Sequence, residues 1–311
     1  MHQKLNGLKI EFLHSDIIYE KIANAPVDKK DDIFRYEMMM PFKGKWDCYN
    51  IPIKSPKEDG YDVVMACEML GFLSPKNITH ETKEDITLLS CEHLKKSCQV
   101  SVENALACFT KRNIQLPTQS YLYTILLANP ESPYVKLSDG YLGDGGIPGY
   151  IFASLTPNEC TMKRLPVALA HECSHNVRFQ FIKWSNDITL GEMMISEGLA
   201  ENFATHLFGE ELAGPWVTKT DSETLHEYIK PLMKDVLDLS GFEKLTPYLY
   251  GDEIAKAQGY FEVGMPYCAG YACGYQMIKY YLQKTGKSII EATILPANEI
   301  LCELDDFWSE P

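Results

Sequence analysis

The sequence predicts an α+β fold in which a mostly helical first part precedes a few strands and then further helices. Two segments rich in aromatic and apolar residues, Tyr121–Leu127 and Tyr150–Leu155, are typical of buried strands. Elsewhere apolar residues recur with helical spacing. This spacing predicts helices over about 12–23, 58–70, 77–111, 162–183, 189–208, 221–239 and 267–285.

Glycine and proline residues mark the ends and irregularities of these elements. Three glycines stand where C-terminal helix caps belong, namely Gly71, Gly209 and Gly286. Pro231 is expected to kink the helix that contains it. The segment 138–149 holds five glycines and is therefore expected to be a loop.

The chain changes character near residue 118, where a helical pattern gives way to strands. This change predicts a mostly helical N-terminal region over 1–118, whose role the sequence leaves open, and a second domain over 119–311. A chain of 311 residues is long enough for two domains, and its 45% of hydrophobic residues is ordinary for a globular protein.

Composition predicts a cytoplasmic protein. The longest apolar stretches, such as Tyr121–Ala128, are far shorter than the roughly 20 residues of a membrane helix. No apolar stretch follows the first basic residues, as it would in a secretory signal. The ten cysteines form no C-x-x-C pair, which favours reduced thiols over a disulfide scaffold.

The acidic balance narrows the choice of partners. Asp and Glu number 43 against 29 Lys and Arg, which gives a net charge of −14. Such a charge repels phosphate backbones and anionic membrane surfaces, so neither a nucleic acid nor a membrane is expected as a partner. The charge is compatible with binding a cation, although a solvated acidic surface explains it more simply.

The strongest chemical signal is His171-Glu-Cys-Ser-His175, within an amphipathic helical segment. Histidines at i and i+4 lie on one face of a helix and can direct ring nitrogens at one ion. Neutral imidazole suits Zn²⁺, and a catalytic zinc site uses three protein ligands and a water. Glu172 can act as general base toward that water. Two ordinary histidines are the alternative, but the apolar lead-in predicts burial, and buried histidines need partners.

A second signal is the pair Glu197 and Glu201, again spaced i and i+4, in a largely apolar helical segment. Neighbouring residues such as Leu199 and Phe203 supply core positions. Carboxylates in such surroundings are costly to bury unless they are paired or bound to a metal. A solvated acidic edge is the alternative, and it fits the apolar neighbours less well.

H-E-x-x-H followed by a glutamate on a later helix resembles the gluzincin metallopeptidases. Glu197 follows His175 by 22 residues, and Glu197-Gly-Leu-Ala resembles the Glu-Gly-aromatic-Ala ligand segment of the aminopeptidase branch. Glu197-x-x-x-Glu201 also resembles the Glu-x-x-x-Asp of thermolysin-like enzymes. The resemblance implies one zinc ion per chain, bound by His171, His175 and Glu197, with Glu201 as the partner of a ligand histidine. Because Glu replaces Asp at 201, the roles of the two glutamates remain open to exchange.

A closer resemblance is to the YjaZ-like family of predicted zinc-dependent proteases. It covers roughly residues 120–303. The matching pieces are His171-Glu-x-x-His175-x-x-Arg178, Glu197-Gly-Leu-Ala-Glu201, the segment Pro266–Tyr275 and the glycine-rich stretch before the first of them. The family implies a zincin-like half, in which a small sheet packs against the active-site helix and its edge strand can hold an extended peptide. Tyr150–Leu155 is expected to be that edge strand.

Two further residues are candidates by the same resemblance. Gluzincins often place a tyrosine or histidine downstream of the third ligand to stabilise the oxyanion, and Tyr271 fits that place; an aromatic core stripe is the alternative. Arg178 lies one turn beyond His175 and is a candidate partner of Glu201 or of a substrate carboxylate. The alternative for Arg178 is an ordinary surface arginine.

The sequence thus predicts a zinc-dependent peptidase that acts on a peptide or protein substrate, with Glu172 as general base toward a zinc-activated water. The alternative is a zinc-containing binding or regulatory protein with vestigial hydrolytic activity. An intact Glu172 favours the enzyme, because a binding protein does not need that carboxylate. Neither the substrate, nor endo- versus exo-cleavage, nor the oligomeric state follows from the sequence.

Overall fold

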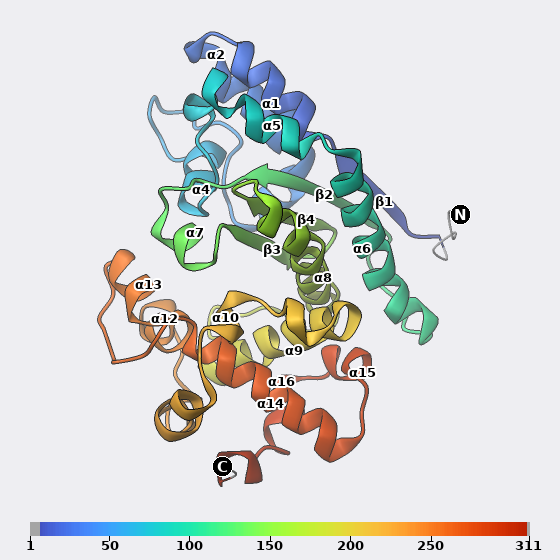
Figure 1. Ribbon diagram of the computed structural model, residues 1–311, viewed down its shortest axis with the longest axis vertical. Coiled ribbons are helices and arrows are strands. Elements are labelled where there is room, and N and C mark those ends of the chain that lie inside the picture. Colours follow the sequence, from blue (N-terminus) through green and yellow to red (C-terminus); the bar gives the residue numbers. More distant parts are fainter. Residues whose placement is uncertain (1–6, 310–311) are drawn as a thin grey trace. The chain divides into compact units, whose positions relative to one another are not determined.

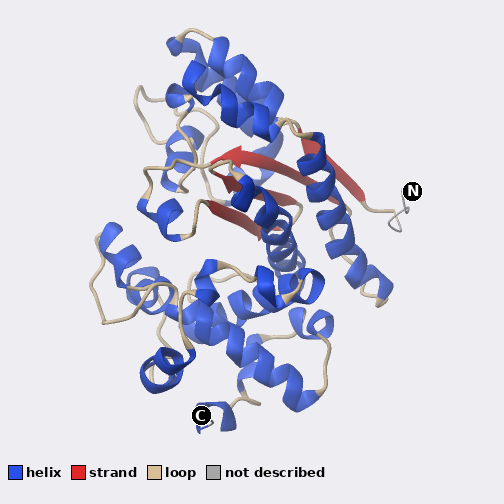
Figure 2. Ribbon diagram, viewed as in Figure 1, coloured by secondary structure: helices blue, strands red, loops and turns tan. Residues whose placement is uncertain are grey.

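The computed structural model describes residues 7–309, so most of the N-terminal stretch in which the sequence shows no secretory signal lies outside the described residues. The secondary structure is that of an α+β protein, as predicted, with one small sheet among many helices (Figure 2). Within residues 7–309, no helix is both long and apolar enough to cross a membrane.

The chain divides into two compact units. The first holds the residues up to Thr110 together with Leu116–Glu172, and the second holds Lys111–Gln115 together with Cys173 onward. The division falls inside helix α8 (Glu159–Phe181). A functional boundary near residue 118 stays a prediction, but the N-terminal region is not purely helical, because it supplies a strand to the sheet.

The first unit is built on a four-stranded sheet of order β1-β2-β4-β3 (Figure 1). The strands are β1 (Lys9–Leu13), β2 (Ser120–Leu127), β3 (Tyr141–Ile147) and β4 (Tyr150–Leu155). β1 and β4 both run parallel to β2, whereas β3 runs antiparallel to β4 and forms one end of the sheet. The two predicted strands are therefore confirmed as its central pair.

Two predictions about this sheet are wrong. The glycine-rich segment 138–149 is not a loop, because most of it forms β3. Tyr150–Leu155 is not the edge strand, because β4 lies between β2 and β3. Glycine is depleted in strands because it has no side chain to pack, which is why the sequence pattern is that of a loop. In β3 the missing side chains allow a helix to approach closely, as the next section describes.

Helices cover both faces of the sheet in the first unit. On one face Phe152 of β4 packs against Phe42 and Trp46, with ring centroids 4.6 and 5.8 Å away. Ala153 and Gly143 are cross-strand partners on the other face, where Gly143 touches α8. The helices of this unit are α1 (Ser15–Asn24), α2 (Val27–Ile33), α3 (Lys43–Cys48), α4 (Val63–Met69), α5 (Lys83–Leu89), α6 (Glu92–Lys111), α7 (Pro133–Leu137) and the first part of α8.

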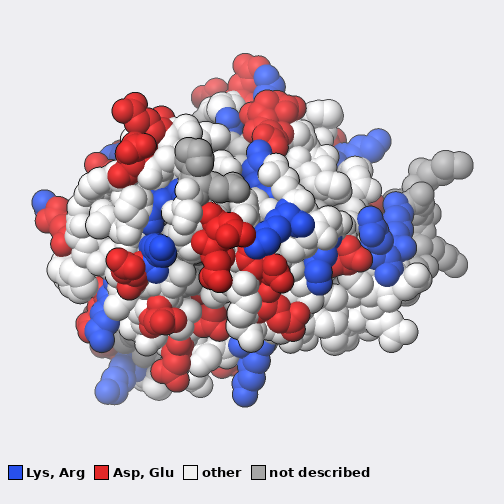
Figure 3. Space-filling view, turned by 90° about the horizontal axis from the view of Figure 1, so that it is seen from below, with Lys and Arg blue, Asp and Glu red and all other residues white. Residues whose placement is uncertain are grey.

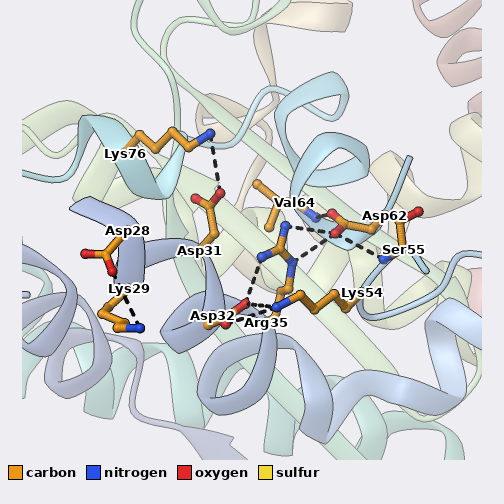
Figure 4. A network of polar contacts seen from close by, with 10 residues as sticks. All are labelled: Asp28, Lys29, Asp31, Asp32, Arg35, Lys54, Ser55, Asp62, Val64 and Lys76. Carbon is orange, nitrogen blue, oxygen red and sulfur yellow. Dashed lines mark hydrogen bonds and ion pairs between the residues drawn. The ribbon is translucent and has the colours of Figure 1, made fainter. Parts of the chain in front are cut away.

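A network of charged residues ties the N-terminal helices of this unit together (Figure 4). Arg35 donates hydrogen bonds to Asp62 and Asp32, each at 2.9 Å. Asp62 also accepts from the backbone N–H of Val64 at 2.9 Å, and this bond caps the N-terminus of α4. Lys54 completes the network through Asp32.

The second unit is helical. Besides the rest of α8 it contains α9 (Leu190–Phe208), α10 (Pro215–Thr218), α11 (Lys230–Lys234), α12 (Phe242–Tyr250), α13 (Asp252–Ala257), α14 (Ala269–Thr285), α15 (Ile289–Thr293) and α16 (Ala297–Leu301). Gly209 and Gly286 cap α9 and α14 as predicted. The helix predicted over 221–239 is shorter and irregular, since a π-helical turn at Thr224–Ile229 immediately precedes α11 and its Pro231.

Helices α9 and α14 pack with almost no space between their backbones. A Cβ atom on Gly198 of α9 would lie 2.1 Å from the carbonyl oxygen of Gly274 of α14. A Cβ atom on Gly274 would lie 2.2 Å from the carbonyl oxygen of Met194. Asn202 adds a hydrogen bond from its side chain to the carbonyl of Tyr275 at 2.9 Å. Two glycines thus fix where α9 lies within the second unit.

Acidic and basic side chains are interspersed on the face in Figure 3. The excess of acidic residues is therefore spread across that face and does not form one anionic site there.

Replacing Gly198 by alanine should lower the free energy of unfolding by about 1–3 kcal/mol, because the added methyl group forces α9 and α14 apart. Urea denaturation measures this change. Gly191→Ala on the same helix is the matched control, since its new Cβ would have no neighbour closer than 3.3 Å. A Gly198→Ala protein as stable as Gly191→Ala contradicts this account of the packing.

Candidate metal centre

Three buried side chains from two helices converge on one point. His171 and His175 lie one turn apart on α8, and Glu197 lies on α9. One ring nitrogen of each histidine and one carboxylate oxygen all lie within 4.8 Å of one another. The three residues are 5%, 7% and 8% exposed. The helical spacing predicted from sequence therefore brings both histidines to Glu197.

Local sequence explains how α9 presents Glu197. A capping box at its start pairs Thr189 and Glu192, each side chain accepting a hydrogen bond from the backbone N–H of the other residue. Gly198 follows Glu197 directly and permits the close contact with α14. Gly198 of the Glu-Gly-Leu-Ala segment thus has a packing role. Its contact with α14 fixes the position and orientation of α9, the helix that carries Glu197.

The donor set fits zinc. Two imidazole nitrogens and a carboxylate oxygen are common ligands of a catalytic zinc ion. Around a tetrahedral zinc, with bonds of about 2.0–2.2 Å, ligand atoms lie roughly 3.3–3.5 Å apart. Nε2 of His175 and Oε2 of Glu197 are 3.1 Å apart, and the whole set lies within 4.8 Å. Small side-chain adjustments suffice to hold such an ion.

Ser196 was not a candidate from sequence, yet its hydroxyl lies 3.3 Å from Nδ1 of His175. If Nε2 of this histidine binds a metal, Nδ1 carries the proton and donates it to Ser196 Oγ. Such partners fix the tautomer and the ring orientation of a ligand histidine. In the sequence, only the position of Ser196 beside Glu197 points to such a role. That position alone does not distinguish Ser196 from any other serine.

Glu172 is held by the backbone of β3. Its Oε2 accepts a hydrogen bond from the N–H of Gly145 at 2.6 Å. A Cβ atom on Gly143 would lie 2.3 Å from Oε1 of Glu172, and one on Gly145 would lie 2.2 Å from the backbone oxygen of Glu172. Real Cβ atoms do not approach so closely, so position 145 requires glycine, whereas a side chain at position 143 would displace the Glu172 carboxylate. The glycines of β3 therefore let the strand lie directly on the carboxylate.

Glu201 binds the segment that follows α9. Its two carboxylate oxygens accept hydrogen bonds from the N–H of Gly214 and from the indole N–H of Trp216, both at 2.6 Å. The side chain is buried, and these two bonds satisfy much of its need for donors. Its predicted role as the partner of a ligand histidine stays a prediction, as does the choice between Glu197 and Glu201 as the third ligand.

Arg178 is buried and is not a surface arginine. Its hydrogen bonds go to backbone carbonyl oxygens and not to Glu201. It is 2% exposed, and its guanidinium donates to the carbonyl oxygens of Thr293 and Leu295 at 2.9 and 2.8 Å. Burial lowers the pKa of Arg178 to about 10, and the Glu192 carboxylate opposes this shift. The group stays charged at neutral pH and ties α8 to the end of α15.

Tyr271 lies in the first turn of α14, and its ring centroid is 5.6 Å from that of Tyr250. Cys268 immediately precedes this helix in a left-handed backbone conformation, with φ at 52°. Burial raises the pKa of the Cys268 thiol, and the Glu197 carboxylate adds to the rise. The start of α14 therefore lies within electrostatic reach of Glu197. The role of Tyr271 as oxyanion donor stays a prediction.

Tyr49, which sequence reasoning also missed, lies near Glu172 in the first unit. Although Tyr49 is 44% exposed, desolvation of its hydroxyl raises its pKa, and the carboxylates of Asp144 and Glu172 add to the rise. Its phenol therefore keeps its proton at neutral pH. No pattern connects residue 49 to residue 172, so only the fold could bring them together.

Purified protein should contain about one equivalent of zinc, and His171→Ala should lose most of it, because each ligand contributes much of the affinity. Glu197→Ala should weaken zinc binding more than Glu201→Ala does. Elemental analysis and competition with a chelator of known affinity measure both effects. A Glu201→Ala protein that binds zinc more weakly than Glu197→Ala would exchange the two assignments.

The comparisons with known proteins agree with this site. The family model described as "Predicted Zn-dependent protease (DUF2268)" matches residues 94–302. The uncharacterized protein YjfC of Bacillus subtilis is 35% identical over 286 residues, which cover 92% of this chain and 94% of YjfC. The uncharacterized protein YjaZ of the same organism is 28% identical over 134 residues, which cover 43% of this chain and 48% of YjaZ. No solved structure matches the chain at a significant level. Since the family model covers more than half of the chain, the chain belongs to the family of predicted Zn-dependent proteases.

Proposed function

We propose that this protein is a zinc-dependent peptidase. The observation that supports it best is a buried cluster of two histidines and a glutamate, with Glu172 next to the first histidine in the chain. A site that only stores a metal does not need a second carboxylate beside its ligands, such as that of Glu172, which Gly145 holds in place. A hydrolytic site needs one, because the attacking water must lose a proton.

In this proposal His171, His175 and Glu197 hold the zinc ion. A bound zinc ion would supply a Lewis acid that polarises the substrate carbonyl and makes a water molecule more acidic. Ser196 keeps the His175 ring in the orientation that ligation requires. In this division α8 and α9 supply the ligands, and Glu172 has the role of proton transfer.

Glu172 acts as the general base. The N–H of Gly145 bonds its Oε2 and fixes the carboxylate, which takes the proton of the attacking water. The same carboxyl group then passes that proton to the leaving amine. Tyr271, in the first turn of α14, is the candidate donor of a hydrogen bond to the oxyanion.

The substrate class is a peptide in extended conformation. β3 ends the sheet, and an extended peptide can add to a sheet edge through main-chain hydrogen bonds. The same strand holds Glu172 through Gly145, so a peptide paired with β3 would lie next to the base. The edge strand predicted from sequence was β4, and the proposal moves this role to β3.

Glu172→Gln should keep zinc and fold but lose at least about 100-fold in peptide hydrolysis. The amide oxygen of glutamine can still accept from Gly145, and its NH₂ group then takes the place of the proton acceptor. Cleavage of a broad peptide library, with zinc content measured in parallel, tests this. His171→Ala is the control that loses both zinc and activity.

A wild-type protein that contains zinc but cleaves no member of the library would favour the alternative, a binding or regulatory protein with vestigial activity. A Glu172→Gln protein as active as wild type would remove Glu172 from the mechanism.

A further inference from the structure

Strand β3 is irregular at the point where it meets Glu172. Asp144 pairs with Phe152 of β4, and the next paired residue, Ile147, faces Tyr150. Gly145 and Gly146 therefore stand opposite a single residue of β4, which is the geometry of a β-bulge. Such a bulge turns backbone groups away from the ladder, and here the N–H of Gly145 bonds the Glu172 carboxylate at 2.6 Å.

A buried ion pair lies on the opposite face of the same bulge. Oδ1 of Asp144 accepts a hydrogen bond from Nζ of Lys45 at 2.8 Å and another from the N–H of Gly146 at 3.3 Å. The Lys45 side chain is fully buried, and that of Asp144 is 19% exposed. Asp144 thus joins the backbone of the bulge to helix α3.

The position of Lys45 is itself constrained. Its ammonium lies 5.2 Å from the ring centroid of Phe152 and 5.3 Å from that of Tyr49. Both rings attract a cation over their faces. A fully buried ammonium needs a counter-charge, and Asp144 supplies it. Lys45 therefore holds Asp144 in one place, and Asp144 holds the backbone of the bulge at Gly146.

We propose that Lys45 and Asp144 are positioning residues for Glu172, because their ion pair fixes the β3 bulge in which Gly145 bonds the Glu172 carboxylate. The consequence for catalysis rests on the proposed peptidase function. The consequence for the geometry of Gly145 does not depend on that function. The effects on catalysis and on geometry can therefore be tested separately.

The spectroscopic test uses the backbone amide of Gly145 in protein labelled with ¹⁵N-glycine. A short bond to a carboxylate moves an amide proton resonance downfield. Glu172→Ala should remove that shift and so identify the resonance. Asp144→Ala should move it upfield by at least half as far, although Glu172 itself is intact.

Two further variants separate positioning from general loss of stability. Lys45→Met/Asp144→Ala removes the buried charge together with its partner, so this protein should stay folded and still show the displaced Gly145 resonance. Asp62→Ala is the matched control, since Asp62 is also a buried carboxylate that bonds a cation and a backbone N–H (Figure 4). It should destabilise the protein but leave the Gly145 resonance in place.

The proposal is wrong if the double variant keeps the wild-type Gly145 resonance, or if Asp62→Ala displaces it as far as Asp144→Ala does. With a cleavable peptide, the double variant should also lose roughly 10- to 100-fold in kcat while its zinc content stays equal to wild type, because a misplaced base does not alter the ligands. If the wild type cleaves nothing, the proposed function fails, and the amide resonance alone decides this inference.

Discussion

The close approach of strand β3 to helix α8 is the contact on which the arrangement around Glu172 depends. Gly143 and Gly145 leave no side chain between the strand and the helix, so a backbone N–H can reach a buried carboxylate. Any side chain at either position would overlap Glu172. β3 therefore lacks the side-chain packing that β-branched residues would provide. In its place, the strand fixes the orientation of the Glu172 carboxyl group.

The second constraint is that buried charged side chains need partners. Each of them finds a different kind of partner. Asp144 neutralises Lys45 on the face of the sheet opposite α8. Glu201 accepts two N–H bonds from the segment after α9. Arg178 donates to two backbone carbonyls at the end of α15. The bonds of Asp144 and Arg178 join elements far apart in the chain, whereas those of Glu201 join α9 to the segment that follows it. Each unit is therefore held by directional bonds as well as by apolar packing.

The second unit positions Glu197, the carboxylate of the candidate metal centre, by a different means. Two glycines bring the backbones of α9 and α14 together, and the side chain of Asn202 bonds across the contact. Both means bring backbones close together and leave them little freedom. A metal ligand and a general base both require such rigidity, because a displacement of about 1 Å can cost a hundredfold in rate.

Helical periodicity by itself determined the most about this protein. Spacing i and i+4 placed His171 and His175 on one helix face, and a similar pattern set the existence of α9 and α14. These features are local, so the residues within one or two turns decide them. The two central strands of the sheet could also be predicted from the sequence, because buried strands have a distinct composition.

The tertiary structure alone decided the identity of the edge strand, the bond from Gly145 to Glu172 and the partner of Asp144. Glycine in a sequence indicates freedom of the backbone, but it does not say whether that freedom serves a turn or a close contact. Lys45 and Asp144 are 99 residues apart, and no periodicity relates them. Such contacts arise only when the sheet and its helices have assembled, because the side chains meet through space and not along the chain.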